Sequence, residues 1–271
     1  MMTTGVCLLA LIVAASAATL YLEKPKESTL LQNSRIINGQ EANPGEFPHQ
    51  VTLLNNGYHM CGGSVISNGW VLTASHCVDG ATISQLAVVV DLHDFSNPGN
   101  YIWFDIESIT MHPQYNKGQG GFPNDVAVLK LNTATTTTDI SKNVITMASG
   151  TDLFANEICT ISGWGVTETG SGASVLMKTD VRVYSNSECR LSWGSNILDQ
   201  HICIRGEDTP NGSGSCNGDS GGPLVCRGQL AGVTSWGRSG CHTNGYVEYP
   251  SVYARVSTFY SWIRSACNNC V

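Results

Sequence analysis

The chain has 271 residues, of which 42% are hydrophobic, 8% aromatic and 13% charged. A chain of this length and composition can bury one large core or two smaller ones, which excludes disordered and low-complexity classes. Its 29 glycines follow no three-residue period, which excludes a collagen-like fold. Acidic residues outnumber basic ones by 21 to 14, so the formal charge is −7 and nucleic acid is not an expected partner.

The N-terminal segment has the pattern of a secretory signal. An apolar run from Val6 to Ala15 precedes the small residues Ser16 and Ala17. We expect residues 1–17 to be removed as a signal peptide, which places the protein outside the cell. A membrane anchor is the alternative, but the run is shorter than the ~20 residues that cross a bilayer, so no membrane association is expected.

A polar, cysteine-free stretch follows and ends at Arg35. The sequence then changes to Ile36-Ile37-Asn38-Gly39. We interpret residues 18–35 as a propeptide that is cut after Arg35, with an ordinary linker as the alternative. Residues 36–271 form the predicted main domain.

The cysteine content fits a secreted protein, because disulfide bonds persist in an oxidising compartment. The chain has 11 cysteines, one of them in the signal segment. Spacing alone does not select a pairing. Neither paired C-x-x-C knuckles nor an H-E-x-x-H motif is present, so no metal is expected.

Short β-rich runs alternate with turn-forming clusters through the body of the chain, which predicts an all-β sandwich or barrel. The runs are residues 50–54, 65–73, 87–90, 126–131, 181–184, 230–235 and 252–256, and the clusters include residues 55–57, 68–69, 97–99 and 170–172. Only residues 257–266 have a helical pattern, with Ser257 as the N-cap and an apolar face. That face consists of Val256, Phe259, Tyr260 and Ile263.

Three motifs stand apart. They are Thr73-Ala74-Ser75-His76-Cys77, Asn124-Asp125-Val126-Ala127-Val128-Leu129 and Gly218-Asp219-Ser220-Gly221-Gly222-Pro223. A single histidine, such as His112 or His201, is expected to be structural, but the order His, Asp, Ser across three such motifs is specific. The chain resembles the chymotrypsin family of serine endopeptidases from Ile36 to about Arg264. In Ile36-Ile37-Asn38-Gly39 and its lysine-poor body it is similar to insect digestive chymotrypsin-like enzymes.

The resemblance implies a chymotrypsin-like fold with two packed antiparallel Greek-key β-barrels, at about residues 50–145 and 146–256, followed by the C-terminal helix. It also implies a catalytic triad. His76 is expected to act as general base, Asp125 to orient it, and Ser220 to act as the nucleophile. The backbone N–H groups of Gly218 and Ser220 are expected to form the oxyanion hole.

An activation step is implied as well. After cleavage at Arg35, the new amine of Ile36 is expected to pair with Asp219 and order the oxyanion turn, so the uncut chain is expected to be an inactive zymogen. Asn38 and Ser75 depart from the usual family residues without threatening activation or activity.

The family's substrate pocket maps onto Gly214, Ser235, Gly237 and Ser251, and Ser235 is also expected to bond Asp125. Because Gly214 stands where trypsin-like members have aspartate, a basic substrate side chain would be buried unpaired. Gly237 leaves the mouth open, so we expect cleavage after Phe, Tyr, Leu or Met. The side chain of Ser251 can reach into the pocket and shorten it, so elastase-like or broad collagenase-like specificity stays open. The nearby Glu248 is expected on an exposed loop and not at the pocket base.

The resemblance also implies the disulfide pairs and leaves two modification questions open. The expected pairs are Cys61–Cys77, Cys159–Cys226, Cys189–Cys203 and Cys216–Cys241. Cys267 and Cys270 are expected to form a terminal disulfide, with a redox motif as the alternative. Asn211 begins a glycosylation sequon that is either modified or an unmodified loop.

Acyl transfer by a triad needs no cofactor. The expected partners are polypeptide substrates, an activating trypsin-like protease and protein protease inhibitors, and the chain is expected to be a monomer in a digestive lumen. A catalytically silent homologue that binds or regulates other proteins is the rival class. An esterase or lipase would show a G-x-S-x-G elbow and the order Ser, Asp, His, and both are missing.

Overall fold

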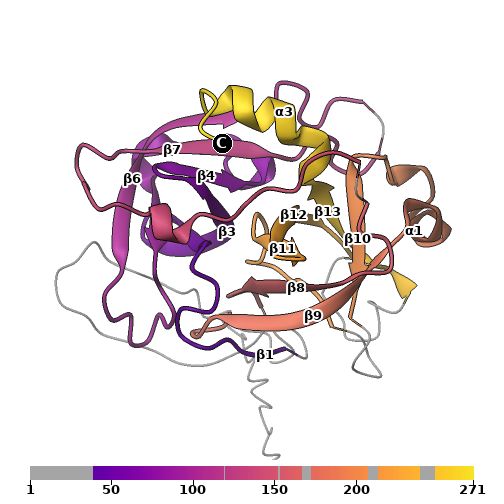
Figure 1. Ribbon diagram of the computed structural model, residues 1–271, viewed down its shortest axis with the longest axis horizontal. Coiled ribbons are helices and arrows are strands. Elements are labelled where there is room, and N and C mark those ends of the chain that lie inside the picture. The colour runs from indigo at the N-terminus through magenta and orange to yellow at the C-terminus, as the bar shows by residue number, and fades with distance from the viewer. Residues whose placement is uncertain (1–38, 119, 152, 167–171, 207–212, 239–247) are drawn as a thin grey trace, which may run out of the picture.

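The computed structural model describes residues 39–118, 120–151, 153–166, 172–206, 213–238 and 248–271 (Figure 1). The expected signal segment, the expected propeptide with Arg35, Ile36 at the cleavage point and the sequon at Asn211 lie outside the described residues. Within the described ranges, no helix is both long enough and apolar enough to span a membrane.

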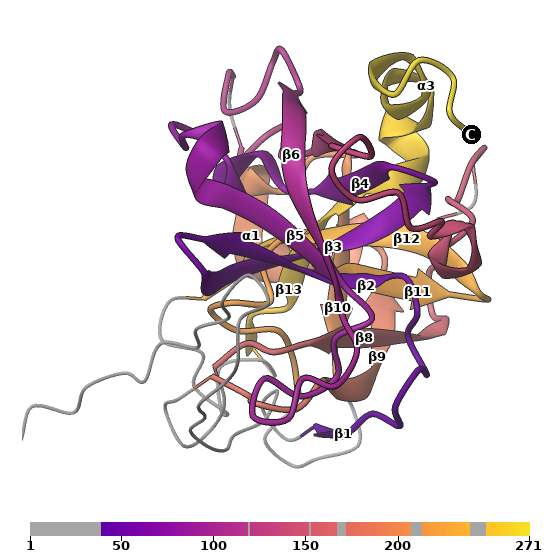
Figure 2. The same ribbon diagram turned by 90° about the vertical axis from the view of Figure 1, so that its left-hand side faces the viewer.

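Six antiparallel strands form a closed barrel in the N-terminal half of the chain. They are β2 (Gln50–Asn55), β3 (Tyr58–Ser67), β4 (Trp70–Thr73), β5 (Leu86–Val90), β6 (Ile102–Met111) and β7 (Ala127–Leu131). The order around the barrel is β2-β3-β4-β7-β6-β5. Because β5 returns to pair with β2, the connection is a Greek key. Figure 2 looks onto this barrel, with β5 and β6 crossing in front.

The second barrel repeats this topology. Its strands are β8 (Ile158–Gly163), β9 (Met177–Tyr184), β10 (His201–Arg205), β11 (Pro223–Cys226), β12 (Gln229–Trp236) and β13 (Ser251–Arg255). A β8–β9 pairing closes the sheet, and β11 lies beside β8 as β5 lies beside β2. The short β1 (Gln40–Glu41) pairs with the edge of β9. The predicted two-barrel, all-β fold is confirmed.

Helices are few. The α1 helix (Asn186–Trp193) begins with a capping box, in which Ser185 and Glu188 bond each other's backbone N–H groups. Four 3-10 turns, η1 (Ser75–Cys77), η2 (Ile83–Gln85), η3 (Ser141–Asn143) and η4 (Gly194–Asn196), join strands or extend α1. The α3 helix (Val256–Ala266) ends the fold.

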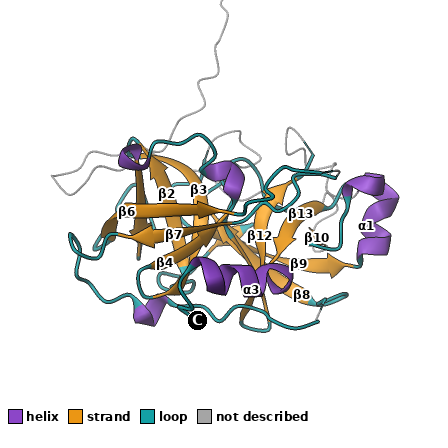
Figure 3. Ribbon diagram, turned by 90° about the horizontal axis from the view of Figure 1, so that it is seen from above, coloured by secondary structure: helices purple, strands orange, loops and turns teal. Residues whose placement is uncertain are grey.

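The C-terminal helix joins the two barrels. Val256, Phe259 and Ile263 of α3 are buried in one apolar cluster with side chains from both barrels. Figure 3 shows α3 lying across the junction. The prediction of Ser257 as the N-cap is wrong, because the helix begins one residue earlier and the extended backbone of Arg255 occupies that position, with no side-chain cap.

Strand boundaries differ from the sequence prediction in particular places. The run at 65–73 is two strands, because Gly69 turns the chain with a φ of +80° between β3 and β4. The β6, β8, β10 and β11 strands and the α1 helix were not predicted. The burial pattern of β10 has no alternation, since four of its five residues are buried, so a period-two pattern is absent there.

Contacts between the barrels hold the motifs together. The Gly62 N–H of β3 donates to the Ser220 carbonyl oxygen at 2.7 Å, and Ser162 Oγ of β8 donates to Gln50 Oε1 of β2 at 2.7 Å. A side chain at Gly221 would meet Thr73 Oγ1 at 2.2 Å and the Gly62 oxygen at 2.6 Å. Glycine at this position therefore lets the Ser220 turn approach the first barrel.

Candidate active site

His76 lies in the η1 turn directly after β4. Its neighbour Cys77 is bonded to Cys61 of β3, which fixes the turn against the barrel. The hydroxyl of Ser75 is buried and donates to the Val126 carbonyl oxygen at 2.7 Å. Ser75 therefore ties the histidine turn to the start of β7, a role that its small size alone did not predict.

Asp125 precedes β7 and is buried, with 1% of its surface exposed. Its Oδ2 atom lies 2.7 Å from His76 Nδ1, and its Oδ1 atom accepts the His76 backbone N–H at 2.9 Å. Ser235 of β12, in the second barrel, donates its hydroxyl to Oδ2 at 2.6 Å. Because Nδ1 faces a carboxylate, the proton belongs on Nδ1, which leaves Nε2 as the basic atom.

Ser220 lies in the turn before β11 and lines the cavity described below. Its hydroxyl forms no hydrogen bond with His76 or with any other residue that the structure describes. The Gly62 N–H bond holds the Ser220 turn against β3, where the neighbouring Cys61 is bonded to Cys77 beside His76. Bonds between a nucleophile and its base often form only when substrate is bound.

The backbone around Gly218 is arranged so that two N–H groups are free. Gly218 has a φ of +95°, which favours glycine. The Asp219 N–H donates to the Cys216 carbonyl oxygen at 3.0 Å. The N–H groups of Gly218 and Ser220, on either side, have no acceptor in the described part of the chain. Two unpaired donors in one tight turn suit an oxyanion.

Asp219 is buried, with 3% of its surface exposed. Its carboxylate accepts the N–H groups of Gly165 and Cys216, each at 2.9 Å. Burial raises the pKa of Asp219 to about 6, and the two N–H bonds oppose that shift. Among the described residues no cation pairs with this carboxylate.

His59 of β3 supports the same turn and was missed by the sequence analysis. Its Nε2 lies 3.0 Å from the Gly218 carbonyl oxygen, and its Nδ1 lies 2.7 Å from Thr52 Oγ1. Burial lowers the pKa of His59 to about 4, so the ring is neutral at pH 7. The neutral ring donates from Nε2 and accepts the Thr52 hydroxyl at Nδ1. Its sequence surroundings gave no motif that could have identified it.

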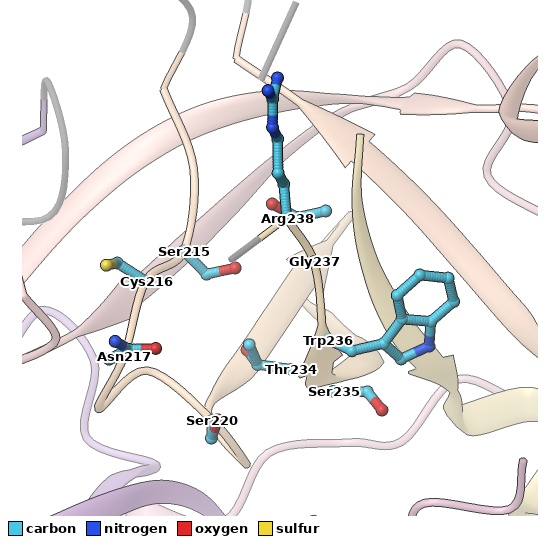
Figure 4. Close-up of a pocket in the computed structure, with 10 residues that line it drawn as sticks. Ser215, Cys216, Asn217, Ser220, Thr234, Ser235, Trp236, Gly237 and Arg238 are labelled. Atoms are coloured by element: carbon cyan, nitrogen blue, oxygen red, sulfur yellow. The ribbon is translucent and has the colours of Figure 1, made fainter. Parts of the chain in front are cut away.

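A cavity of about 290 Å³ opens beside Ser220 (Figure 4). It is lined by Ser215, Cys216, Asn217, Ser220, Thr234, Ser235, Trp236, Gly237, Arg238 and Ser251. Ser235, Gly237 and Ser251 of the predicted pocket are therefore brought together. Gly214 is buried beside Ser215 but does not line the cavity.

Arg238 sets the charge of this cavity, and Gly237 sets the width of its mouth. Among the described residues, no acidic side chain lines the cavity. The one charged residue in its described lining is Arg238, which is basic. Glu248 is exposed and faces Arg238 at 3.7 Å. A Cβ atom added at Gly237 would find nothing closer than Ser251, at 3.9 Å, so the mouth is open.

Four of the expected disulfide bonds are present: Cys61–Cys77, Cys159–Cys226, Cys189–Cys203 and Cys267–Cys270. Cys216 is also disulfide-bonded, but Cys241 lies outside the described residues. Cys61, His76 and Cys77 offer donor atoms within 4.8 Å of one another. Because the two sulfur atoms are bonded to each other, they are not thiolates that could hold a metal.

Comparisons with known proteins agree with this geometry. The trypsin family model matches residues 36–263. The fibrinolytic enzyme, isozyme C, of Lumbricus rubellus is 36% identical over 239 residues, which cover 84% of this chain and 98% of that protein. The solved structure of neuropsin, a serine protease expressed in the limbic system of mouse brain, is similar with a TM-score of 0.73 and 28% identity. It covers 86% of this chain and 100% of its own.

Proposed function

The chain belongs to the trypsin family of serine proteases, and from this premise we propose a secreted endopeptidase that cuts after large apolar or aromatic residues. One observation carries the proposal of activity. His76 Nδ1, the Ser235 hydroxyl and the His76 N–H all converge on the buried Asp125, beside the Ser220 turn with its two free N–H groups.

The proposed chemistry proceeds through an acyl-enzyme. Ser220 Oγ attacks the substrate carbonyl carbon while His76 Nε2 accepts the hydroxyl proton. Asp125 stabilises the imidazolium that forms. His76 then donates the same proton to the leaving amine, and the C–N bond breaks. A water molecule then attacks the acyl carbonyl carbon, with His76 again as the base. The ester bond to Ser220 Oγ breaks, and His76 returns the proton to Ser220 Oγ as the acid product leaves.

The oxyanion of each tetrahedral intermediate is proposed to lie at the N–H groups of Gly218 and Ser220. Each donor of this kind contributes about 100- to 1,000-fold to the rate. His59 is proposed to hold the Gly218 carbonyl oxygen so that this turn keeps its orientation.

The primary specificity follows from the cavity lining. With Arg238 at the cavity and no carboxylate among its described lining residues, a lysine or arginine side chain would be disfavoured. The open Gly237 admits a large ring. Seven of the ten lining residues carry polar side chains, so a tyrosine hydroxyl finds partners there as well. Cleavage after Phe, Tyr, Leu or Met is therefore favoured over elastase-like specificity.

Activation by cleavage after Arg35 is part of the proposal. The buried Asp219 carboxylate has two N–H partners but no described cation, and the new amine of Ile36 is proposed to supply the charge. Such pairing would keep Asp219 ionised and order the neighbouring Gly218 turn. An extracellular digestive role, an activating trypsin-like protease and protein inhibitors complete the proposal.

The decisive experiment measures kcat/KM on tetrapeptide anilides ending in Phe, Tyr, Leu, Ala or Arg, before and after trace trypsin. We expect activity only after cleavage, with Phe, Tyr and Leu ahead of Ala and Arg. Ser220→Ala is the matched variant, and it should lose roughly 10⁴-fold or more in kcat with unchanged circular dichroism. No turnover from a correctly folded chain with a confirmed Ile36 terminus would favour a catalytically silent binding protein.

A further inference from the structure

A second cavity, of about 390 Å³, lies on the second barrel and shares no lining residue with the Ser220 cavity. It is lined by Leu153, Ala155, Tyr184, Ser185, Asn186, Asp199 and Arg255. These residues come from the segment before β8, the end of β9, the start of α1, the segment before β10 and the end of β13. Figure 1 shows α1 and β10 on the side of the molecule away from the first barrel.

The wall of this second cavity is largely apolar. Leu153 has 57% of its surface exposed, and Ala155 is exposed as well. The Tyr184 ring adds an aromatic surface whose face is covered by the Arg205 guanidinium, at 4.6 Å from the ring centroid. A volume of this size suits a small organic molecule, and the apolar wall suits a hydrocarbon body.

Arg255 is the buried member among the polar residues that line the cavity. The residue has only 4% of its surface exposed. It donates to the carbonyl oxygens of Leu153 at 3.0 Å and His201 at 2.7 Å, to Asn186 Oδ1 at 3.1 Å and to the Asp199 carbonyl oxygen at 3.3 Å. All four acceptors are neutral. A guanidinium has five N–H donors, and these four bonds use the one on Nε, both on Nη2 and one on Nη1. The second N–H of Nη1 therefore has no acceptor within the described ranges.

The nearby carboxylates are already engaged elsewhere. The Asp199 side chain is 96% exposed and pairs with Arg190 at 2.8 Å. The Glu188 carboxylate caps the start of α1 by accepting the Ser185 N–H at 2.8 Å. In the part of the chain that the structure describes, no carboxylate lies within ion-pair distance of Arg255. Burial without a counter-ion lowers the pKa of Arg255 to about 10, and Asp199 opposes this only in part.

A buried guanidinium with a spare donor, at an apolar cavity of this size, calls for an anion with an apolar body. We propose that this cavity is a second binding site, which takes a small organic carboxylate. Its carboxylate accepts from Arg255, and its hydrocarbon chain lies against Leu153, Ala155 and Tyr184. The concave shape and the depth of Arg255 favour a slender ligand over the broad surface of a protein partner.

The test is calorimetric titration of the full chain with sodium octanoate, and with octanamide as the uncharged match. We expect one octanoate per chain and at least about tenfold weaker binding of octanamide, because hydrogen bonds to charged groups are the stronger ones. Equal binding of the two compounds, or binding of acetate as tightly as octanoate, would overturn the proposal.

Variants locate the site without disturbing Arg255, whose removal risks unfolding. Ala155→Glu places a carboxylate at the cavity and should weaken octanoate binding at least about tenfold, as should Leu153→Glu. Ala134→Glu, at an exposed alanine in the turn after β7, is the matched control and should bind as the parent does.

Gly237→Val separates this site from the primary pocket. It should leave octanoate binding unchanged, because Gly237 lines the other cavity. Loss of binding in Gly237→Val together with retention in the folded Ala155→Glu variant would place octanoate in the primary pocket and refute the second site. Thermal unfolding of each variant checks the fold independently of enzyme activity.

Discussion

Ser235 and His76 bind the same oxygen of Asp125: Ser235 Oγ lies 2.6 Å from Oδ2, and His76 Nδ1 lies 2.7 Å from it. The histidine comes from the first barrel and the serine from the second. A single buried oxygen thus links the two barrels where the chemistry is proposed to occur.

This shared oxygen gives the first prediction. Ser235→Ala removes one charge-assisted bond but leaves His76 its partner, so kcat should fall about tenfold with little change in KM. Asp125→Asn should cost roughly 10⁴-fold in kcat, because an amide selects the wrong histidine tautomer. Ser162→Ala, another buried serine at the barrel junction, is the control and should stay within about twofold of the parent. A larger loss for Ser235→Ala than for Asp125→Asn would contradict this order.

Gly237→Val tests the primary pocket. The added side chain enters open space toward Ser251, so the protein should fold normally while the pocket mouth narrows. We expect kcat/KM for Phe substrates to fall about 100-fold or more and that for Ala substrates to change little, which reverses the preference. Steady-state kinetics on the anilide series measures this. An unchanged preference for Phe would show that substrate side chains do not pass Gly237.

The disulfide bonds should contribute to stability in the order of the loops they close. The loops span 67 residues for Cys159–Cys226, 16 for Cys61–Cys77 and 3 for Cys267–Cys270. In the chain-entropy model, paired Cys→Ala variants lose about 4, 3 and 2 kcal/mol of unfolding free energy, respectively. Urea denaturation measures these losses. A larger loss for the Cys267–Cys270 variant than for the other two would contradict this order. It would show that tertiary contacts of the tail outweigh loop length, such as the bond from Ser67 Oγ to the Cys270 carbonyl oxygen at 2.8 Å.

Stability should fall as the pH is lowered from about 6.5 to 4. Burial lowers the pKa of His49, His59 and His201 to about 4 each, so in this window the unfolded chain binds protons that the folded chain does not. Asp219 acts in the opposite sense, because its raised pKa of about 6 makes the folded chain take up a proton first. Three histidines outweigh one carboxylate, so acidification destabilises the protein.

Denaturation midpoints at pH 7, 5.5 and 4.5 measure this dependence. His49→Met removes one titrating ring and should make the dependence shallower, whatever its effect on stability at pH 7. His112→Met, at a partly exposed ring, is the comparison variant and should change the dependence less. Stability that rises on acidification would show that Asp219 outweighs the histidines.

The sequence by itself predicted an all-β fold, and its resemblance to the chymotrypsin family implied the two barrels and the residues proposed for chemistry. The β-rich runs, the turn clusters and the motifs around His76, Asp125 and Ser220 are local features, and each can be seen without knowing what packs against it. The same holds for the apolar face of the C-terminal helix.

Tertiary structure decided what depends on residues far apart in the chain. No local pattern reveals that His59 holds the Gly218 carbonyl oxygen, that Ser75 reaches Val126, or that β10 is a strand buried on both faces. Arg255 lies within a strand that the sequence predicts at residues 252–256, yet only folding buries its guanidinium among neutral acceptors. Burial and long-range contacts set these properties, because desolvation and hydrogen bonding depend on neighbours that only the folded chain brings together.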